Sequence, residues 1–462
     1  MNRSLGISRR NALTMVLTTA GSVLAERITY AASQPIIGTT NLRGGIDARA
    51  EGLVPGALDE QSRKLASIIA KAASSGQPVF LPPGTYRISN LDLPDGTRLH
   101  GVAGATRLVY GGGGHLFNAQ GANRIEVSGL VIDGAGRELG EHVSALIHLR
   151  DVGETIIENC EIIGSAKTGI QLERCGGRID RCRIAGAADY AALAIESTGL
   201  SITGNTVTDC GNGGILVHRW TKGPDGTLVT GNRITGTRAT NGGTGQYGNA
   251  INVYRADNVQ VIGNQISASA FSAIRSNAGS NVQIANNQCL ASGETAIYSE
   301  FGFEGAIVNG NVVDGAANGI SIVNFNEGGR MATVSGNVVR NLSLTAPYEQ
   351  SDTFFGLGIS VEADTAVSGN VIENAPRFGL LLGWGPFLRN VTVTGNVVRQ
   401  AKTGCAVSVA DGAGSAVITN NLFENTPGGG VIGHRWHDVA SKELALDAAG
   451  FPHLTVAGNR VI

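Results

Sequence analysis

The chain has 462 residues, of which 67 are glycine, and aromatic residues make up only 5%. Its formal net charge is −2, and removing residues 1–25, which hold three arginines and no acid, changes it to −5. A negative charge argues against a nucleic-acid ligand, because binding to phosphates relies on clustered Lys and Arg. Many glycines with few aromatic residues are instead typical of short strands joined by turns.

Residues 1–32 have the pattern of an export signal. Arg9 and Arg10 precede a moderately apolar run that is too short to span a membrane, and no acidic residue comes before Glu26. The arginine pair resembles a bacterial twin-arginine signal, although Ala12 stands where Phe is usual, and an ordinary Sec signal is the alternative. Either route predicts a periplasmic or extracellular protein with no membrane span in its mature chain. The first route makes the twin-arginine export machinery a partner.

The next part of the chain is predicted to be a linker over 33–56 and an N-terminal cap with the first coils over 57–125. Residues 58–73 place apolar side chains on one helical face, and the strand-like phrase VFLPPGTYRI follows at 79–88. A stack of strands has an open end with unpaired edges, so an amphipathic helix at this point predicts a lid. The apolar face consists of Leu58, Leu65, Ile68, Ile69 and Ala72.

A short phrase recurs from residue 126 onward: an apolar residue, two positions, Asn, one position and another apolar residue, as in ITGNTV at 202–207. The basic spacing of 22 to 24 residues indicates a solenoid, and period-two runs of Ile and Val indicate strands rather than leucine-rich repeats. Residues 126–462 are therefore predicted to form an all-β, single-stranded right-handed parallel β-helix of about 12–13 rungs. The recurring residues are Asn205, Asn232, Asn264, Asn287, Asn311, Asn337, Asn370, Asn396, Asn421 and Asn459.

The recurring asparagine is predicted to mark a corner between two strands, because Asn tolerates the left-handed backbone that a sharp corner needs. Side-chain amides stacked at ~4.8 Å can also hydrogen-bond to one another, so a structural ladder is expected. Cys160 and Cys182 occupy the Asn position upstream and are expected to be stacked free thiols, since parallel side chains strain a disulfide. A bond from Cys175 to Cys182 or Cys210 is the alternative in an oxidising compartment.

The predicted helix, followed by VFLPPGTYRIS and LPDGTRLHG, resembles the start of the pectate-lyase-like β-helix superfamily of lyases, polygalacturonases, alginate epimerases and phage tailspikes. Joined to the signal, the repeats resemble still more a family of exported bacterial repeat proteins whose activity is not established. The resemblance covers nearly the whole chain and implies that a sugar chain lies along the strands of the Gly-Ile-x-Val-x phrase. The clustered aspartates and Gly-His-Gly element of polygalacturonases and the calcium-binding aspartates of pectate lyases have no counterpart here.

Three insertions interrupt the repeats, at 239–249, 342–356 and 437–452. The first two lie between an Asn corner and the next Gly-Ile strand, so they are expected to flank the same face. The third contains 441–449, which is predicted to be a short helix near the C-terminal end, where a second cap belongs.

In the Gly-Ile-x-Val-x strands, Ile and Val are predicted to point inside and the x positions outside. The outward stripe is rich in His, Arg, Glu and Tyr over its first seven rungs and thins later, and a solvated polar face is the alternative to a site. The predicted pairs are His148 and Arg150, Gln171 and Glu173, Ala194 and Glu196, Leu216 and His218, Asn252 and Tyr254, Arg275 and Asn277, Tyr298 and Glu300, and later Ser321 and Val323, Ser360 and Glu362, Leu381 and Gly383, Val407 and Val409, and Ile432 and His434.

This stripe supplies the candidate site residues. A lyase or epimerase needs a cation to neutralise a uronate, a base and an acid, and side chains of all three types lie on successive rungs. Two carboxylate pairs also have glycosidase-like spacings: Glu173 and Glu196 at ~5 Å and Glu300 and Glu362 at roughly 10 Å. The catalytic candidates are His218, Tyr254, Tyr298 and Glu300, and the substrate-binding candidates are Arg150, Glu173, Glu196, Arg255, Arg275 and Glu362.

The tripeptide His-Arg-Trp occurs at 218–220 and again at 434–436, and the distance of eight rungs predicts two local turns with a stacking Trp rather than one site. No cofactor is identifiable from a motif. His434, His437, Asp438 and His453 gather near the third insertion, but their spacing does not support a divalent metal.

The sequence thus predicts an exported β-helix protein that acts on an acidic, uronate-containing polysaccharide as a lyase, epimerase or hydrolase. The alternative is a non-catalytic envelope protein whose stripe holds a glycan or another protein. Unsaturated product from a uronate polymer would distinguish the two.

Overall fold

The structure is a computed structural model that describes residues 44–242, 245, 247–348 and 355–462. Residues 47–462 form one compact unit, which is described by itself. The predicted export signal over 1–32 and residues 33–43 of the predicted linker lie outside the described residues.

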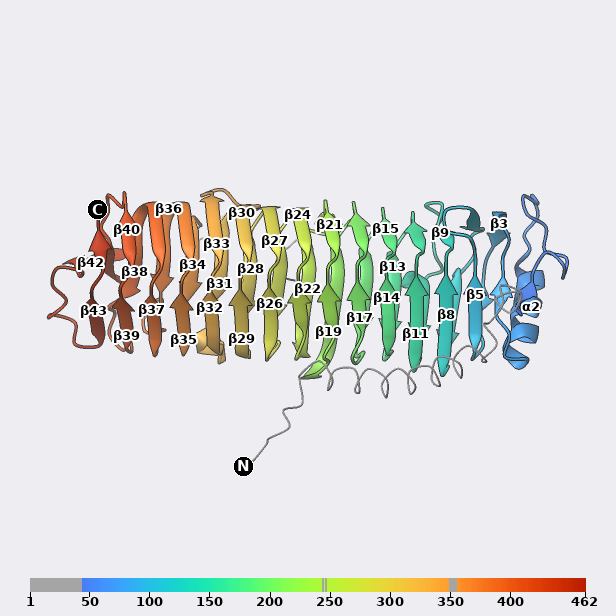
Figure 1. Cartoon of the computed structure of the whole chain (residues 1–462), viewed down its shortest axis with the longest axis horizontal. Helices are drawn as coiled ribbons and strands as arrows, with labels where there is room; N and C mark the ends of the chain where they lie inside the picture. The colour runs from blue at the N-terminus through green and yellow to red at the C-terminus, as the bar shows by residue number, and fades with distance from the viewer. Residues whose placement is uncertain (1–43, 243–244, 246, 349–354) are drawn as a thin grey trace, which may run out of the picture. The chain divides into compact units, whose positions relative to one another are not determined.

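The N-terminal end of this unit is covered by helix α2 (Ser62–Ser74), which buries Leu65, Ile68, Ile69 and Ala72 against the first strands (Figure 1). The helix is shorter than the apolar pattern suggested. Leu58, which was predicted to lie on its apolar face, precedes the helix and is 91% exposed.

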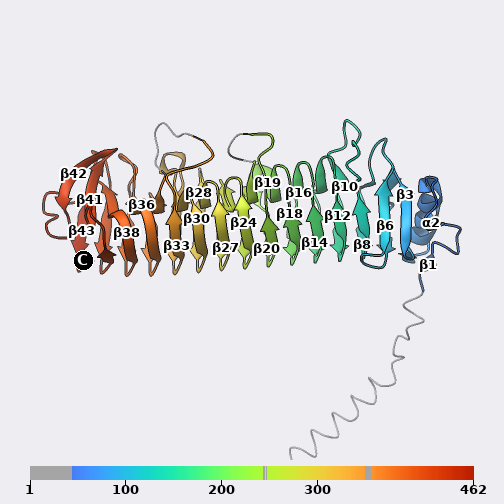
Figure 2. The ribbon, with the colours of Figure 1, turned by 90° about the horizontal axis from the view of Figure 1, so that it is seen from above.

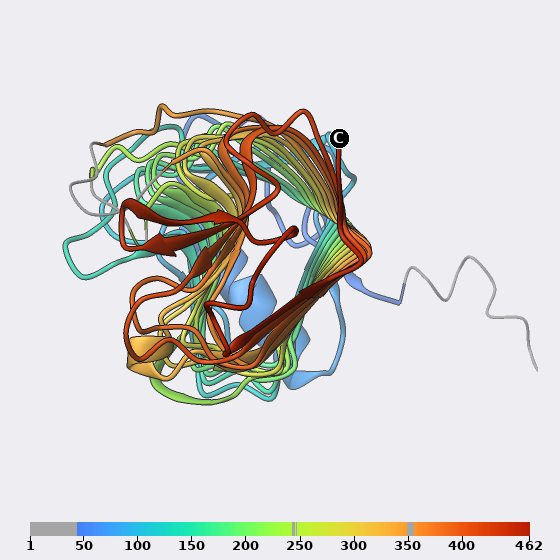
Figure 3. The same cartoon turned by 90° about the vertical axis from the view of Figure 1, so that its left-hand side faces the viewer.

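Each turn of the solenoid contributes three short strands, and each strand pairs in parallel with the strand one turn later. The predicted right-handed parallel β-helix is confirmed, with about 14 turns rather than 12–13. Figure 3, a view near the solenoid axis, shows the three strand series stacked as separate faces.

The first strands of the turns form the face that was predicted to carry the site. They are β4 (Leu91–Asp92), β7 (Phe117–Gln120), β10 (Ala145–Arg150), β13 (Thr168–Glu173), β16 (Tyr190–Ile195), β19 (Gly213–Pro224), β22 (Asn249–Asp257), β25 (Ile274–Asn277), β28 (Thr295–Glu300), β31 (Asn318–Ile322), β34 (Leu357–Val361) and β41 (Val431–Arg435).

The second strands form a sheet of their own. They include β2 (Val79–Phe80), β5 (Thr97–His100), β8 (Arg124–Ser128), β11 (Glu154–Glu158), β14 (Gly177–Asp180), β17 (Ser201–Thr203), β20 (Leu228–Thr230), β23 (Gln260–Ile262), β26 (Val282–Ala285), β29 (Glu304–Asn309), β32 (Arg330–Ser335), β35 (Thr365–Ser368), β37 (Val391–Thr394), β39 (Ala416–Thr419) and β43 (Leu454–Ala457).

The third strands join the first ones into one sheet, because β36 (Val371–Leu382) and β38 (Val397–Ser408) each continue from a third strand into the next first strand. The others are β3 (Gly84–Ile88), β6 (Thr106–Tyr110), β9 (Val131–Asp133), β12 (Glu161–Ile163), β15 (Arg183–Ala185), β18 (Thr206–Thr208), β21 (Arg233–Thr235), β24 (Gln265–Ser269), β27 (Gln288–Ser292), β30 (Val312–Ala316), β33 (Val338–Leu342), β40 (Leu422–Glu424) and β44 (Arg460–Val461).

The predicted asparagine ladder runs between the second and third strands, from Asn205 to Asn459. In each step the backbone N and side-chain Nδ2 of one asparagine donate to Oδ1 of the next, as from Asn287 to Asn311 at 2.9 and 3.0 Å. Nδ2 also donates to a carbonyl oxygen of an earlier strand, that of Val261 at 2.9 Å in this case. The amides are therefore buried inside the corner with every group paired.

The reason given for asparagine at this corner was wrong. The residue in the left-handed region is the one before it, such as Gly204 at φ 63° or Gly310 at φ 64°. Asn205 and Asn311 are not in that region, and their side chains point into the solenoid. Asparagine is used here because its amide has an acceptor for the preceding turn and a donor for the following one, as Asn311 has for Asn287 and Asn337.

Two cysteines extend the ladder toward the N-terminus. Cys182 N donates to Oδ1 of Asn205 at 2.8 Å, and the Sγ atoms of Cys160 and Cys182 lie 3.6 and 3.5 Å from the carbonyl oxygens of Val127 and Ile157. All six cysteines are buried and free in the described part of the chain.

The described parts of the insertions at 239–249 and 342–356 project from the same side of the solenoid (Figure 2). The third insertion does not contain the predicted helix. Its residues form β42 (Asp438–Glu443), which pairs antiparallel with β41. The Glu443 carboxylate accepts hydrogen bonds from Gly430 N and Val431 N at 2.6 and 2.8 Å, so a hairpin covers this end of the first-strand face.

Candidate functional site

Two rows of side chains run along the outer face of the first strands. Strand register defines the upstream row as His148, Gln171, Leu193, Leu216, Asn252, Arg275, Tyr298 and Ser321. The downstream row is Arg150, Glu173, Ile195, His218, Tyr254, Asn277 and Glu300.

The predicted outward residues were wrong at two strands. In β16, Leu193 and Ile195 take the outward positions, and Ala194 is in register with the inward Leu172. In β38, Val407 pairs with the buried Leu382, so its neighbour Ala406 takes the outward position. Strand β16 reads Ala-Ala-Leu-Ala-Ile, and a run of small apolar residues fits either phase of a period-two pattern.

Glu196 therefore does not stack on Glu173, and the predicted glycosidase-like pair is not formed. Glu196 follows β16 in a left-handed bend at φ 50°. Its carboxylate accepts hydrogen bonds from Trp220 N and Thr221 N at 2.6 and 3.2 Å and pairs with Arg219 at 2.8 Å. Glu196 thus holds the part of β19 that carries Trp220.

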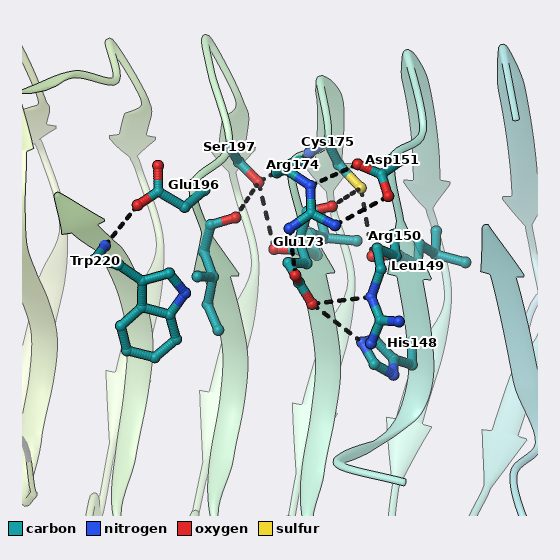
Figure 4. A network of polar contacts seen from close by, with 12 residues as sticks. His148, Leu149, Arg150, Asp151, Glu173, Arg174, Cys175, Glu196, Ser197 and Trp220 are labelled. Atoms are coloured by element: carbon teal, nitrogen blue, oxygen red, sulfur yellow. Dashed lines mark hydrogen bonds and ion pairs between the residues drawn. The ribbon is translucent and has the colours of Figure 1, made fainter. Parts of the chain in front are cut away.

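Glu173 is committed to an ion-pair network (Figure 4). Its carboxylate pairs with Arg150 Nε at 3.0 Å and with Arg174, which also binds Asp151 at 2.6 and 3.0 Å. Burial opposes ionisation of Glu173, but the two arginines outweigh it and lower the pKa. His148 lies 4.0 Å from the same carboxylate. The two arginines hold Glu173 in its ionised form and weaken it as a base.

A cleft of about 440 Å³ opens at the next turns, around His218. Strand β19 contributes Trp220, which is 63% exposed, and the insertion at 239–249 contributes Gly245. Tyr247 of the same insertion stacks on Tyr190 with ring centroids 6.5 Å apart. The lining residues are Tyr190, Leu193, Ile195, His218, Trp220, Gly245, Asn252, Tyr254, Arg275 and Asn277.

His218 and Asn252 supply polar atoms to this cleft. Nε2 of His218 and Oδ1 of Asn252 are buried, and neither has a hydrogen-bond partner among the described residues that meets the usual geometry. Burial lowers the pKa of His218 to about 4, and the nearby amide of Asn252 opposes this only in part. The His218 ring meets Tyr254 edge-on at 5.6 Å. His218 is therefore a neutral imidazole at neutral pH.

Arg275 reaches the cleft from β25, but its charge is already compensated. Glu300 binds it through two hydrogen bonds, at 2.7 Å to Nε and 3.0 Å to Nη2, and Glu294 lies 3.5 Å from Nη1. Burial alone would lower the pKa of Arg275, but the two carboxylates raise it. Asn277 Nδ2 donates to Glu300 at 2.8 Å, and Tyr348 Oη donates to Glu294.

Glu300 and Tyr298 do not line the cleft. Both carboxylate oxygens of Glu300 face Arg275, so its role is to position that side chain. The Tyr298 ring lies under the Arg275 guanidinium, 4.9 Å from centroid to Cζ, and burial raises the pKa of its hydroxyl. Tyr254 is covered in the same way by Arg255, whose Nη1 donates to Trp220 O at 2.8 Å.

Glu362 lies two turns beyond Glu300 and outside the cleft. The turn η2 (Phe325–Glu327) covers it, and Phe325 N donates to its carboxylate at 2.6 Å. Burial raises the pKa of Glu362 to about 7. Since Glu300 is bound to Arg275, the two carboxylates do not form the free pair that their two-rung separation suggested.

A second hollow, of about 580 Å³, adjoins the cleft and shares Leu193 with it. It holds Gln171, Asp189, Asn212 and Lys167. Lys167 Nζ donates to three carbonyl oxygens at 2.6 to 3.2 Å, and burial raises the pKa of Asp189.

Of the ten predicted site residues, the cleft brings together His218, Tyr254 and Arg275, with Arg255 stacked on Tyr254. Arg150, Glu173, Glu196, Tyr298, Glu300 and Glu362 lie elsewhere. Tyr190 and Leu193 were missed. The signal for Tyr190 was an aromatic residue at the start of a strand, one turn before His218.

The two His-Arg-Trp copies differ in local conformation, because Trp220 lies within β19 whereas Trp436 follows β41 in a turn at φ 56°. In each copy the arginine binds a backbone carbonyl of the preceding turn: Arg435 Nε donates to Val409 O at 3.2 Å, and Arg219 Nη1 donates to Ser197 O at 3.1 Å. Trp436 packs edge-on against Trp384 at 5.6 Å. In the described part of the chain no group of three or more His, Cys, Asp or Glu side chains is placed to hold a metal ion.

A family model described as right handed beta helix region matches residues 105–234. A comparison with curated protein sequences finds no significant match. Within the described residues, no helix has the length and apolar character needed to cross a membrane.

Among solved structures, the N-terminal fragment of bacteriophage phi29 gene product 12 matches with a TM-score of 0.58 and 15% identity, over 90% of this chain and 71% of the other. A tailspike protein mutant of E. coli bacteriophage HK620, in complex with a hexasaccharide, matches with a TM-score of 0.51 and 12% identity, over 92% and 79%. The A-module of the mannuronan C-5 epimerase AlgE6 from Azotobacter vinelandii matches with a TM-score of 0.45 and 16% identity, over 90% and 99%. At such identities the likeness shows the fold alone.

Proposed function

We propose that the protein binds a carbohydrate chain in the cleft around His218. The cleft combines the rings of Tyr190, Trp220 and Tyr254 with two neighbouring buried polar atoms, on His218 and Asn252, that make no well-formed hydrogen bond among the described residues. A sugar presents apolar C–H faces that fit aromatic rings and hydroxyls that fit such polar atoms. The hexasaccharide bound by the HK620 tailspike, which shares the fold, supports a glycan as the ligand.

The ligand is proposed to be an oligosaccharide rather than a single sugar. The hollow beside Gln171 and Asp189 lies on the same face and meets the cleft at Leu193. A chain held by Trp220 and Tyr190 would continue along the first strands into this second hollow, where Asp189 and Asn212 offer hydrogen-bond partners.

Binding without bond cleavage is the function that this geometry supports best. Among the described residues that line the cleft around His218, none is Asp or Glu, and a glycosidase needs two carboxyl groups at the scissile bond. The Arg275 charge, which was expected to neutralise a uronate, is already neutralised by Glu300 and Glu294. We therefore favour a non-catalytic glycan-binding protein, exported by the signal predicted over 1–32.

Lyase or epimerase action on a uronate polymer is the second candidate. It is favoured by the neutral imidazole of His218, which suits a base, and by the neighbouring hydroxyl of Tyr254, which suits an acid. The exposed Arg255 stacked on Tyr254 would then meet the uronate carboxylate.

Affinity electrophoresis through gels that contain one polysaccharide each, neutral β-glucans and dextran beside alginate and polygalacturonate, tests the proposal. We expect the protein to be retarded by at least one polymer and Trp220→Ala to weaken that retardation tenfold or more, equivalent to about 1.4 kcal/mol. Trp436→Ala is the matched control, because Trp436 ends the other His-Arg-Trp sequence and is partly exposed outside the cleft. Retardation that is equal in both variants, or absent on every polymer, contradicts glycan binding in this cleft.

The same polymers distinguish the two candidates. Release of unsaturated product, abolished by His218→Asn but not by Trp436→Ala, would establish the enzyme. Retention without any product on alginate and polygalacturonate leaves the binding function.

A further inference from the structure

A stripe of aliphatic side chains lies on a face that the proposed function does not use. The first outward residue of the third strands changes from polar to aliphatic at β30 and stays aliphatic for five consecutive turns. Upstream this position holds Glu161, Arg183, Thr206, Arg233, Gln265 and Gln288; the aliphatic stripe consists of Val312, Val338, Val371, Val397 and Leu422.

These side chains are in contact with solvent. Val338 and Val371 at the middle of the aliphatic stripe are 38% and 41% exposed, and the other three are half-buried. The inward position of each strand is filled by a separate buried residue, such as Val339 or Ile372, so the core does not need them. A continuous exposed row of this kind is a feature of interaction surfaces.

A row of alternating charges, here called the charge row, borders the aliphatic stripe. It consists of the side chains two residues after the aliphatic stripe on each third strand, and their charges alternate between negative and positive over five turns. Arg340 pairs with the preceding acid at 2.7 Å, and Arg399 pairs with the acids on both sides at 2.9 and 3.4 Å. The charge row consists of Asp314, Arg340, Glu373, Arg399 and Glu424.

We propose that the aliphatic stripe and the charge row form a self-association surface for a second copy of this chain. A two-fold axis parallel to the strands places stripe against stripe and charge row against charge row, with the two solenoids antiparallel. Centred on Glu373, this arrangement would oppose like charges. Displaced by one turn it opposes Arg340 to Glu373 and Asp314 to Arg399, each twice by symmetry, so the surface is complementary to itself.

The dimer is expected to be weak. Five turns at ~4.8 Å per strand span about 20 Å, so the surface is smaller than the ~800 Å² that each partner buries in a standard interface. Dissociation at low concentration and association at high concentration follow. The glycan cleft lies on the first-strand face and stays open in both states.

Sedimentation velocity of the whole chain over a range of concentrations, from about 1 μM to about 1 mM, tests this surface. We expect a monomer–dimer equilibrium that Val371→Lys weakens tenfold or more, because the new ammonium would be buried without a partner. Gln265→Lys is the matched control, since Gln265 holds the same strand position upstream, and it should associate like the parent. Circular dichroism and thermal melting check that both variants are folded.

Charge exchange tests the register. Arg340→Glu should weaken association, and Glu373→Arg added to it should restore association, because the two charges are then exchanged across the interface. Failure of the double variant to restore it overturns the antiparallel register. A chain that stays monomeric at every concentration, or a dimer that is insensitive to Val371→Lys, overturns the self-association surface; in the monomeric case the occupant would be residues 1–43 of the same chain or another protein.

Discussion

The asparagine ladder and the outer rows of the first strands are built on the same backbone repeat and behave in opposite ways. In the ladder, the same side chain returns at every turn, so each amide finds an identical partner one strand spacing away. In the outer rows, the side chain changes at every turn, and neighbours as different as Ile195 and His218 or Arg275 and Tyr298 meet. The fold comes from what repeats, and the site comes from what differs.

The asparagine ladder and the outer rows also differ in what a one-residue shift in strand register would do. Every ladder position is set by a buried amide, so register is fixed there. The outer face of β16 carries no such marker. Because Leu193 points outward instead of the expected Ala194, the cleft has an apolar floor and Glu196 lies outside it. Four predictions probe this contrast between the uniform interior and the variable exterior.

The largest effect is expected where the outer row contains a buried charge. Arg275→Met leaves Glu300 and Glu294 without their cation, and breaking a buried ion pair costs about 3–5 kcal/mol. Urea unfolding of the variant and of the parent measures this loss. A change below about 1 kcal/mol would mean that the carboxylates relax into water or take up protons.

Two half-buried groups on the first-strand face should make stability depend on pH with opposite signs. The pKa of Glu362 is raised from 4.5 to about 7, so its contribution is complete below pH 4.5 and is lost as pH rises through about 7. At 1.36 kcal/mol per pKa unit this is about 3 kcal/mol, and Glu362→Gln should remove that fall. Unfolding free energies of both proteins near pH 5 and about pH 8 measure it.

His218 is the comparison group. Its pKa is lowered from 6.5 to about 4, so its contribution is complete above pH 6.5 and is lost as pH falls through about 4. His218→Asn should therefore flatten the acid side of the curve and leave the alkaline side unchanged. Variants that alter the same side of the curve would contradict the opposite signs.

Removing one amide of the ladder should lower the unfolding free energy by less than removing the buried Arg275 charge does, but by more than removing an exposed amide. Asn311→Ala removes the acceptor used by the N and Nδ2 atoms of Asn287, and we expect a loss of about 2–3 kcal/mol. Asn309→Ala is the matched control, because that exposed side chain binds Ser335 on the outside of the same corner. Equal melting temperatures for the two variants would show that the ladder has no special role.

The smallest effect is expected for the exposed part of the outer row. Arg150→Ala breaks one contact of a half-exposed network in which Glu173 keeps Arg174, so stability should change by about 0–1 kcal/mol. Retention on a glycan should be unchanged, since Arg150 lies outside the cleft. A loss of retention in affinity electrophoresis would extend the site beyond the second hollow.

Periodicity made the solenoid predictable, because one reading of a turn could be checked against the next. The same periodicity placed His218, Tyr254 and Arg275 together. It could not place Glu294, which lies in a bend before β28, or Tyr348, which lies in an insertion, and these two residues complete the surroundings of Arg275. The alanines of β16 also could not indicate which residues of that strand point inward and which point outward. Residues outside the repeat are positioned by packing, for which no pattern in the chain acts as a guide.

The ladder also has a direction. Each asparagine donates to the side chain of the turn that follows it in the chain, as Asn396 does to Asn421 at 2.9 Å. During synthesis or stepwise refolding, the most recently added turn therefore carries two amide donors that wait for the next one. Each new turn of the solenoid therefore supplies the hydrogen-bond acceptor that the preceding asparagine lacks. A chain arrested during folding would have one corner with unpaired amide donors, at the last turn formed.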